Sequence, residues 1–357
     1  MQGLREERGL KNIVLIGNPA AGGGALKKIE KAASIIRDKG FAVRVLLTGK
    51  RGDAESFARE IASDPPPFKK AGQGGILVIA AGGDGTYNEV ANGLIHSDVP
   101  MAVLPLGTSS VLAKELRLPG DLDKAVHIAL NGSIQTVHVG KITLKDSDKL
   151  RVTSNGLKDK KDTEDLSPVT GNVTRYFLLM AGIGFDAETV FGISERIKKY
   201  TGKAAYILSG IETVMKYNPS PLTIKGYGAP VVNHEGKGSG PLAFRPSSIV
   251  LTGYTAIIGK ASCYGGNFKI TPDASLTDPH FYVFVTHKKS RASLIKYVAG
   301  IVKGFHLGFK DISYFRAAEI EVEGNAPIQI DGDYAGAAPA KIEIARDALK
   351  IVMGRGI

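Results

Sequence analysis

One stretch of the chain, residues 76–94, restricts the possible folds more than any other. It reads ILVIAAGGDGTYNEVANGL: an apolar run, a glycine-rich turn, and a segment in which Val90, Ala91 and Leu94 would share one helical face. An unbroken apolar run of this length is typical of a strand that is buried on both faces. The stretch therefore predicts a strand, a tight turn and a helix, the repeating unit of an α/β sheet.

The turn in this stretch is suited to a phosphate group. Gly82, Gly83 and Gly85 carry no Cβ, so an anion can approach the backbone N–H groups at the helix start. Asp84 stands among them, and Mg²⁺ prefers carboxylate oxygen as a ligand. An ordinary turn with Asp84 or Thr86 as the helix N-cap explains the same residues. The residues by themselves leave both interpretations open.

Two better-known phosphate loops are excluded. The chain has no G-x-x-x-x-G-K-[ST] motif, so it is not a P-loop NTPase. The G-x-G-x-x-G pattern of dinucleotide-binding folds also fails, because Asn88 occupies the sixth position counted from Gly83.

The strand–turn–helix unit repeats through residues 12–131. Strands are expected at 13–16, at 41–47, from 76 and at 101–104, and helices at 25–37, 53–62, 87–94, up to 116 and at 121–130. Such repeats predict a parallel sheet with helices on both faces. Ligands of open α/β sheets bind beyond the carboxyl ends of the strands. The predicted site is therefore formed by the loops 18–24, 48–53, 82–88 and 107–110, and its natural ligand is a nucleotide polyphosphate with Mg²⁺.

The pattern changes after Gly132. Short β-rich segments separated by turns predict an antiparallel sandwich; they lie at 136–144, 176–180, 249–256, 281–286, 319–322 and 328–330. Two helical interruptions are expected at 194–217 and 290–305, and two long polar loops at 145–174 and 226–247. We therefore predict an α/β nucleotide-binding domain over 1–134 and an all-β domain with helical insertions over 135–357.

The charge and the missing targeting signals restrict partners and location. The 357 residues carry a net charge of +11, which favours an anionic partner such as a nucleotide, a nucleic acid or an acidic membrane. The single cysteine, Cys263, allows no intrachain disulfide, which fits a reducing compartment. The sequence shows neither an apolar signal-peptide core nor an apolar run of about 18 residues, so we expect a cytoplasmic protein, integral to no membrane.

Five motifs stand out along the chain: NPAAGGG at 18–24, GGDGTYNEV at 82–90, PLGTSSVLAKEL at 105–116, AGIGFDAE at 181–188 and YGGNFKITPDA at 264–274. Together they resemble the motifs of the bacterial diacylglycerol kinase-type lipid kinases. They occur in that family's order and extend the resemblance over residues 12–350. The second motif also occurs in the related NAD kinases, whereas the last two favour the lipid kinases.

The resemblance implies that ATP binds between an N-terminal α/β domain and a C-terminal β-sandwich. In this role Asp84 would help to organise Mg²⁺. The implied nucleotide contacts are Asn18, Pro19, Ala20, Ala21, Gly22, Thr48, Gly82, Gly83, Asp84, Gly85, Thr86, Tyr87, Asn88 and Thr108.

The resemblance also implies a general base near the C-terminus. Family members have an Asp-Gly-Glu there, whose last acid is taken as the base. This chain has Asp331-Gly332-Asp333, which makes Asp333 the candidate base. Its side chain is one methylene shorter than that of the family's Glu, so its carboxylate would be displaced and Asp331 is the alternative. Asp-Gly between two strands is also a strong signal for a hairpin turn, which can coexist with catalysis.

A structural Mg²⁺ site is implied at residues 273–281. Asp278 would supply the acid, and Ser275 and His280 would supply backbone carbonyls. The family's usual glycine after the acid is Pro279 here, and proline cannot adopt the positive φ that glycine allows.

Lysines recur every seven residues at 289, 296, 303 and 310. They predict either a basic helix that faces a membrane or, by the more ordinary interpretation, a solvated face opposite a core face. That core face would comprise Leu294, Tyr297, Val298, Ile301 and Phe305.

The sequence therefore predicts an ATP- and Mg²⁺-dependent lipid kinase that acts on diacylglycerol or a similar neutral lipid, in contact with the inner face of a membrane. Two alternatives remain: a NAD-kinase-like phosphotransferase with a soluble substrate, and a nucleotide-binding regulator without catalysis. No nucleic-acid partner is expected, since no recognition module or aromatic platform is visible. The oligomeric state, homodimer included, is left open.

Overall fold

The computed structural model describes residues 12–63, 75–107, 110–144, 172–185, 219–228, 248–264 and 268–354. They divide into two units. Unit 1 comprises the described residues up to Val139 and those from Ala345 on. Unit 2 comprises Gly140–Tyr264 and Phe268–Ile344. The predicted helix at 194–217 lies outside the described residues.

Unit 1 is built on a parallel sheet in the order β2-β1-β3-β4, with the C-terminal end of β16 beside β4. Its strands are β1 (Asn12–Gly17), β2 (Ala42–Leu47), β3 (Ile76–Gly82), β4 (Met101–Pro105) and β16 (Ala340–Met353). All seven residues of β3 are buried, as expected for the central strand. This sheet confirms the predicted fold class.

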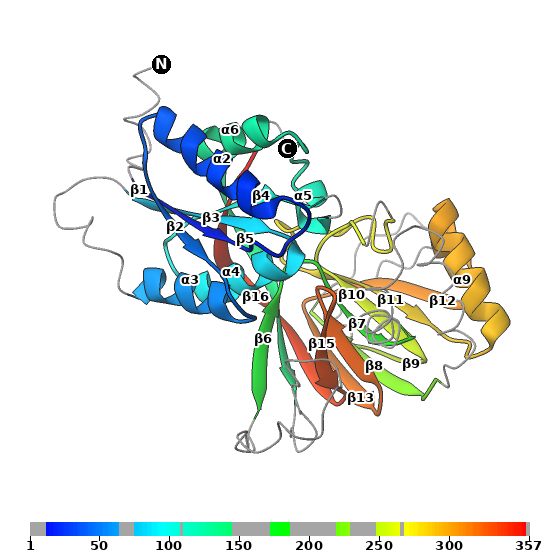
Figure 1. Ribbon diagram of the computed structural model, residues 1–357. Coiled ribbons are helices and arrows are strands. Elements are labelled where there is room, and N and C mark those ends of the chain that lie inside the picture. Colours follow the sequence, from blue (N-terminus) through cyan, green and yellow to red (C-terminus); the bar gives the residue numbers. More distant parts are fainter. Residues whose placement is uncertain are drawn as a thin grey trace, which may run out of the picture. The chain divides into compact units, whose positions relative to one another are not determined.

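Helices cover both faces of this sheet (Figure 1). They are α2 (Ala25–Asp38), α3 (Asp53–Ser63), α4 (Asp84–Leu94), α5 (Val111–Glu115) and α6 (Leu122–Asn131). α2 and α6 pack together on one face, and their core includes Ile29, Ile36 and Val126 against alternate strand residues such as Leu15 and Ile79. α3 and α4 pack together on the other face. The residues between those alternate positions, Val14 and Val78 among them, are also fully buried.

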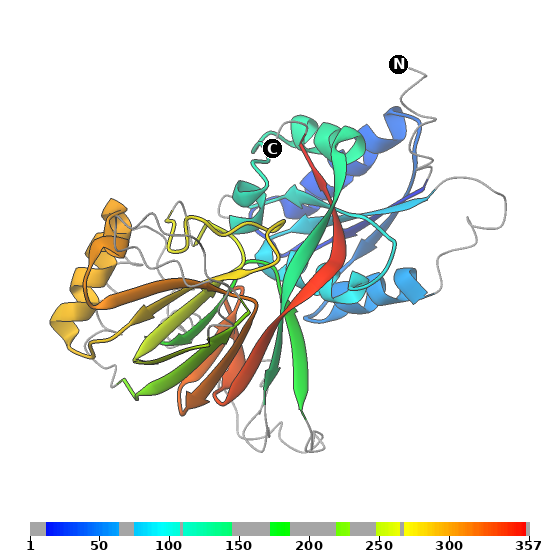
Figure 2. The same cartoon turned by 180° about the vertical axis from the view of Figure 1, so that it is seen from behind.

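Unit 2 is a sandwich of antiparallel strands, as predicted (Figure 2). One sheet has the order β12-β11-β10-β7-β14-β15, and the other includes β16, β13, β8 and β9. Alternate residues of both sheets, such as Ile183, Ile258, Ile224 and Ile320, form the core. The strands are β5 (Ser133–Leu144), β6 (Val173–Phe177), β7 (Met180–Gly184), β8 (Leu222–Tyr227), β9 (Ile249–Gly253), β10 (Thr255–Gly259), β11 (Phe281–Thr286), β12 (Ile312–Ala317), β13 (Glu319–Gly324), β14 (Pro327–Ile330) and β15 (Asp333–Ala337).

Two segments that the sequence predicts as single strands are each divided. The segment 176–180 breaks at Leu178 and Leu179, and the segment 249–256 breaks at Tyr254. In each case the strand before the break belongs to one sheet and the strand after it to the other. A change of sheet leaves no mark in the apolar pattern, because both sheets bury apolar residues in the same core.

Unit 2 also carries the helix α9 (Arg291–Lys303), which lies beside β12 and is followed by the short 3₁₀ helix η3 (His306–Gly308). Ser290 caps the start of α9, and Gly304 ends it with a φ of 77°. This confirms the helix predicted at 290–305. Among the described residues, no helix is long and apolar enough to cross a membrane.

Strands β5 and β16 each continue from one unit into the other. The last part of β16, from Ala345 on, therefore belongs to unit 1. The predicted division at 134/135 instead assigns all residues from 135 to 357 to the second domain. β16 pairs with β13 over Ala340–Glu343 and with β4 at Ile351, and hydrophobic alternation cannot reveal this change of partner.

Candidate functional site

The predicted loops of unit 1 meet at one edge of the sheet. Register places Gly17 opposite Leu47 and Ala81, and Gly82 opposite Pro105, so the four strands end together. Asn18 joins two of the loops: its Oδ1 accepts a hydrogen bond from the Ala20 N–H at 2.9 Å, and its Nδ2 lies 3.4 Å from Thr86 Oγ1. A third loop is in contact, since a Cβ added to Gly107 would lie 3.3 Å from the Ala21 carbonyl oxygen. Thr108 lies outside the described residues.

The three glycines of the central turn have two different reasons to be glycine. A Cβ on Gly82 would lie 2.5 Å from Thr86 Oγ1, so packing excludes a side chain there. Added Cβ atoms on Gly83 and Gly85 would meet nothing within 4 Å. The open space beside these two residues is what a ligand that approaches the main chain would need.

The helices that begin at the glycine loops differ from the other helices. α5, α6 and α9 are capped by the side chains of Ser110, Asp121 and Ser290. α2 and α4 begin after Gly24 and Gly83, and among the residues that the structure describes no side chain caps either of them. Their first N–H groups therefore present positive charge at the edge where the loops meet, which is the arrangement that binds phosphate.

The first turn of α2 strengthens this positive charge. It contains Lys27 and Lys28 and no acid, and the Lys28 ammonium donates to the Leu106 carbonyl oxygen at 2.7 Å. Cations at a helix N-terminus oppose the helix dipole, so they cost stability unless an anion is near. Sequence reasoning missed these two lysines, although their place in the first turn after three glycines was the available signal.

Asp84 lies at the same edge, and its carboxylate organises a neighbouring helix. Its Oδ1 accepts from the Leu112 N–H at 2.9 Å and from Ser110 Oγ at 3.2 Å, and its Oδ2 accepts from the Val111 N–H at 2.9 Å. Asp84 therefore satisfies the first turn of α5 from a different loop. Oδ2, with a single donor among the described residues, keeps a lone pair for a cation or for a water bound to one.

We expect Asp84→Ala to lower the free energy of unfolding by about 1–3 kcal/mol, because three donors at the start of α5 lose their acceptor. Urea unfolding of the variant and the wild type measures the difference. Asp121→Ala is the matched control, since it removes an N-cap that accepts one backbone N–H, from Lys124, and should cost about 1 kcal/mol. An equal or smaller loss in Asp84→Ala would contradict this role.

Two further residues of the central motif make side-chain hydrogen bonds within the protein. Tyr87 is fully buried, and its hydroxyl lies 2.7 Å from the Gly82 carbonyl oxygen and 3.2 Å from that of Leu104. Burial raises the pKa of Tyr87 far above its ordinary value. Any contact of Tyr87 with a nucleotide must therefore come from its backbone. The Asn88 side-chain oxygen accepts a hydrogen bond from the Asn92 side-chain amide at 3.1 Å.

Glu89 is a residue that the sequence analysis did not select. Its two carboxylate oxygens accept from the Gly52 N–H at 2.9 Å and the Ala54 N–H at 3.2 Å, which caps the start of α3. Asp53 adds bonds from the N–H groups of Gly49 and Lys50, so the loop that follows Thr48 is held from both sides. No local signal predicts this, because the helix that Glu89 caps is not its own.

In unit 2, Asp331 and Asp333 have different surroundings. Asp331 and Gly332 form the two-residue turn of the β14–β15 hairpin with φ values of 49° and 91°, which confirms the predicted turn. The Asp331 carboxylate accepts from the N–H groups of Leu178, Leu179 and Met180 at 2.7, 2.8 and 3.0 Å. Asp331 therefore holds the break between β6 and β7. Asp333 is half-buried at the start of β15.

The loop predicted to hold a structural Mg²⁺ contains a cation of the protein itself. The Lys260 side chain is fully buried, and its ammonium donates to the carbonyl oxygens of Ser275 and of Asp278, the latter at 2.8 Å. The Ser275 carbonyl oxygen is one of the predicted metal ligands. An ammonium at this place repels a second cation and takes up the oxygen that the cation would need.

The acid of this loop is also occupied by protein groups. Around the Asp278 carboxylate lie His280 Nδ1 at 2.7 Å, the Tyr282 hydroxyl at 3.1 Å and the Arg316 guanidinium at 3.4 Å. Burial acts to raise the pKa of Asp278, but the bond from His280 and the charge of Arg316 outweigh it and lower the pKa below its ordinary value. The residues of this loop therefore do not fit a bound Mg²⁺. The described residues contain no cluster of three or more metal-ligating His, Cys, Asp or Glu.

Comparison with known proteins agrees with both units. A sequence profile of the diacylglycerol kinase catalytic domain matches residues 12–142, and one of the YegS C-terminal NAD kinase beta sandwich-like domain matches residues 180–353. The diacylglycerol kinase of Bacillus subtilis (strain 168) is 26% identical over 350 residues, which cover 96% of this chain and 97% of the relative. This chain belongs to the bacterial diacylglycerol kinase-type family.

Other members of the family are similarly distant. The diacylglycerol kinase of Staphylococcus carnosus (strain TM300) is 25% identical over 335 residues, with 92% of this chain and 91% of the relative covered. The crystal structure of a diacylglycerol kinase from Bacillus anthracis str. Sterne has the same fold, with a TM-score of 0.62 and 20% identity over 97% of each chain. Membership in the family supports a lipid kinase kind of activity.

Proposed function

We propose that this family member transfers the γ-phosphate of ATP, with Mg²⁺, to the hydroxyl of diacylglycerol or a similar neutral lipid. The observation that carries the proposal is the pair of helices, α2 and α4, that start uncapped from glycine loops at one sheet edge. Their N–H groups, with Lys27 and Lys28, supply the positive charge that a polyphosphate requires.

The residues that would hold the nucleotide lie on the loops at that edge. We infer contacts from 18–22, Thr48, 82–88 and Thr108, with Tyr87 contributing through its backbone. Bound Mg²⁺ would neutralise phosphate charge during the transfer. Asp84 fits a role beside the ion through Oδ2 or an intervening water, because Oδ2 accepts one N–H, from Val111, whereas Oδ1 accepts from both Ser110 and Leu112.

Asp333 is the proposed general base. The lipid hydroxyl oxygen forms a bond to the γ-phosphorus, its proton passes to the Asp333 carboxylate, and the bond from phosphorus to the bridging oxygen breaks with its electron pair leaving on ADP. Asp331 supports this step indirectly, since its three backbone hydrogen bonds fix the turn from which Asp333 projects. The carboxylate of Asp331 is thus a positioning group.

A labelling experiment tests the proposal. The full chain is incubated with γ-labelled ATP, Mg²⁺ and, separately, diacylglycerol, monoacylglycerol, ceramide, sphingosine or phosphatidylglycerol in mixed micelles. We expect one neutral lipid to be labelled and Asp333→Ala to abolish the labelling. Labelling of NAD in place of every lipid would show a soluble-substrate phosphotransferase, and ATP binding without any labelled product would show a regulator; either outcome overturns the proposal.

A further inference from the structure

α9 has an apolar face on the side that points away from its unit. Its inward residues Leu294 and Tyr297 are buried against Phe185, Phe309 and Ile312. On the opposite side, Ile295, Val298 and Val302 are 59%, 45% and 57% exposed, and Phe305 just after the helix is 51% exposed. The solvent side of a surface helix is normally polar, so a row of branched apolar residues there is unexpected. We call these four residues the outer stripe.

The chain around the outer stripe is strongly basic. Residues 288–310 contain six Lys and Arg and no Asp or Glu. All six are exposed, and one of them, Lys296, binds both carboxylate oxygens of Asp311 at 2.6 Å through its ammonium. Cations flanking an apolar helix face are the pattern of a helix that lies at the interface of an anionic membrane.

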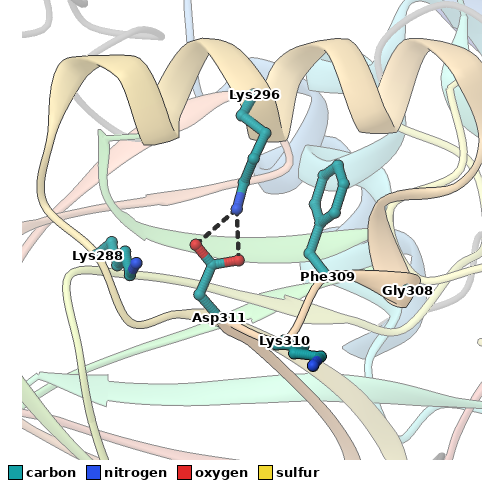
Figure 3. A pocket seen from close by; sticks show the side chains of 6 residues that line it. All are labelled: Lys288, Lys296, Gly308, Phe309, Lys310 and Asp311. Carbon is teal, nitrogen blue, oxygen red and sulfur yellow. Dashed lines mark hydrogen bonds and ion pairs between the residues drawn. The ribbon is translucent and has the colours of Figure 1, made fainter.

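A shallow pocket continues from the outer stripe. It has a volume of about 480 Å³ and is lined by Lys288, Lys296, Gly308, Phe309, Lys310 and Asp311. Figure 3 shows Lys296 reaching down to Asp311, with Phe309 at its side and Lys288 and Lys310 at the rim. Its three lysines outnumber its one aspartate, so the pocket is positively charged.

An aromatic pair connects the outer stripe to the pocket. The rings of Phe305 and Phe309 meet edge to face at 5.4 Å between centroids, and the Lys296 ammonium lies 4.7 Å from the Phe309 centroid. Gly300 makes this possible, because a Cβ there would lie 2.5 Å from the Phe309 ring. The apolar surface and the cationic pocket are therefore one continuous surface held by packed side chains.

We propose that this surface docks the protein on an anionic lipid bilayer, with the outer stripe in the interfacial layer and the lysines against phosphate head groups. A protein partner would have to match six cations without a single acid in the segment, whereas an anionic bilayer offers negative charge of any spacing. The proposal rests on the proposed function, because a kinase for a water-insoluble lipid must reach its substrate at a membrane. The core face that the sequence predicts is confirmed at Leu294 and Tyr297, whereas Val298 and Phe305, which were expected on it, are exposed.

Sedimentation with vesicles tests the docking surface on the full chain. One vesicle contains phosphatidylcholine and phosphatidylglycerol in equal amounts, and the other contains phosphatidylcholine alone. We expect binding to the anionic vesicle only, and we expect Lys303→Glu with Lys310→Glu to weaken it by about tenfold or more. Ile295→Ser with Val302→Ser tests the outer stripe in the same way.

Two matched controls separate this surface from general effects of charge and hydrophobicity. Arg44→Glu with Lys124→Glu changes the net charge equally at exposed positions of unit 1. Val250→Ser removes an apolar side chain that is 61% exposed on β9. Both controls should bind as the wild type does, and all variants should keep its thermal midpoint.

Activity in detergent micelles separates this inference from the proposed function. Micelles deliver lipid without a bilayer, so the α9 variants should phosphorylate diacylglycerol there as the wild type does. If no lipid is phosphorylated but anionic vesicles bind through α9, the proposed function fails and the docking surface stands. Absence of wild-type binding to the anionic vesicle, equal binding by the α9 variants, or an equal loss in the controls would each overturn the docking surface.

Discussion

Replacing Asp333 by asparagine is expected to lower kcat by about 10²- to 10⁴-fold, the usual contribution of a positioned general base. Asparagine has nearly the size of aspartate but cannot take the proton of the lipid hydroxyl. KM for ATP should change little, because the nucleotide contacts that we propose lie on the glycine loops. Steady-state kinetics with the lipid identified by the labelling experiment measure both constants.

Two other variants make this prediction specific. Asp333→Glu restores the acid that the family usually carries and should retain most of the activity. Asp331→Asn should reduce stability, because one amide oxygen replaces two carboxylate oxygens that accept three N–H groups. If Asp333→Asn kept near-normal kcat while Asp331→Asn, still folded, lost it, the assignment of the two acids would be reversed.

Lys260→Met is expected to lower the free energy of unfolding by about 2–5 kcal/mol. Methionine fills much of the space of the lysine stem but leaves the carbonyl oxygens of Ser275 and Asp278 without the ammonium that they accept from. Lys269→Met is the matched control, since Lys269 is exposed in the same unit and should change stability by less than about 0.5 kcal/mol. Urea unfolding of both variants provides the comparison.

Urea unfolding of the wild type also tests whether the Lys260 ammonium occupies the position at which the family resemblance implies Mg²⁺. Because Lys260 is covalently part of the chain, the wild-type unfolding midpoint should not respond to EDTA or to added Mg²⁺. Metal analysis of the dialysed protein should find no stoichiometric ion. A midpoint that falls in EDTA would show that the loop does bind a metal and that Lys260 has another role.

Local patterns of the sequence predicted much of the fold. The apolar run from Ile76 and the glycines that follow it specify a buried strand and a turn within a few residues, and strand periodicity after Gly132 specifies the sandwich. The loops 18–24 and 82–88 and the residue Gly107 meet because parallel strands end at one edge, which follows from the order of elements alone. The Asp331–Gly332 hairpin was equally local, since its positive φ values are a property of the dipeptide.

What the sequence could not specify depends on residues that are far apart in the chain. Asp84 caps α5, Glu89 caps α3, and Lys260 closes the loop at Ser275 and Asp278, and in each pair the partner lies on another element. Asp331 and Asp333 stand two residues apart, yet only one of them meets the N–H groups of residues 178–180. The charge and period of α9 were visible, but which of its faces is buried was not.

The sequence by itself determined the α/β and β-sandwich classes, the sheet edge at which the glycine loops meet and the family, because these depend on periodicity, turn residues and short motifs. The tertiary structure decided which acids are occupied by backbone donors, which cation fills the loop at Ser275, and which apolar residues of α9 face outward. The physical reason is that hydrogen bonding and burial are properties of pairs in space. A carboxylate or an ammonium has the same letter in the sequence whether a protein group, a ligand or water satisfies it.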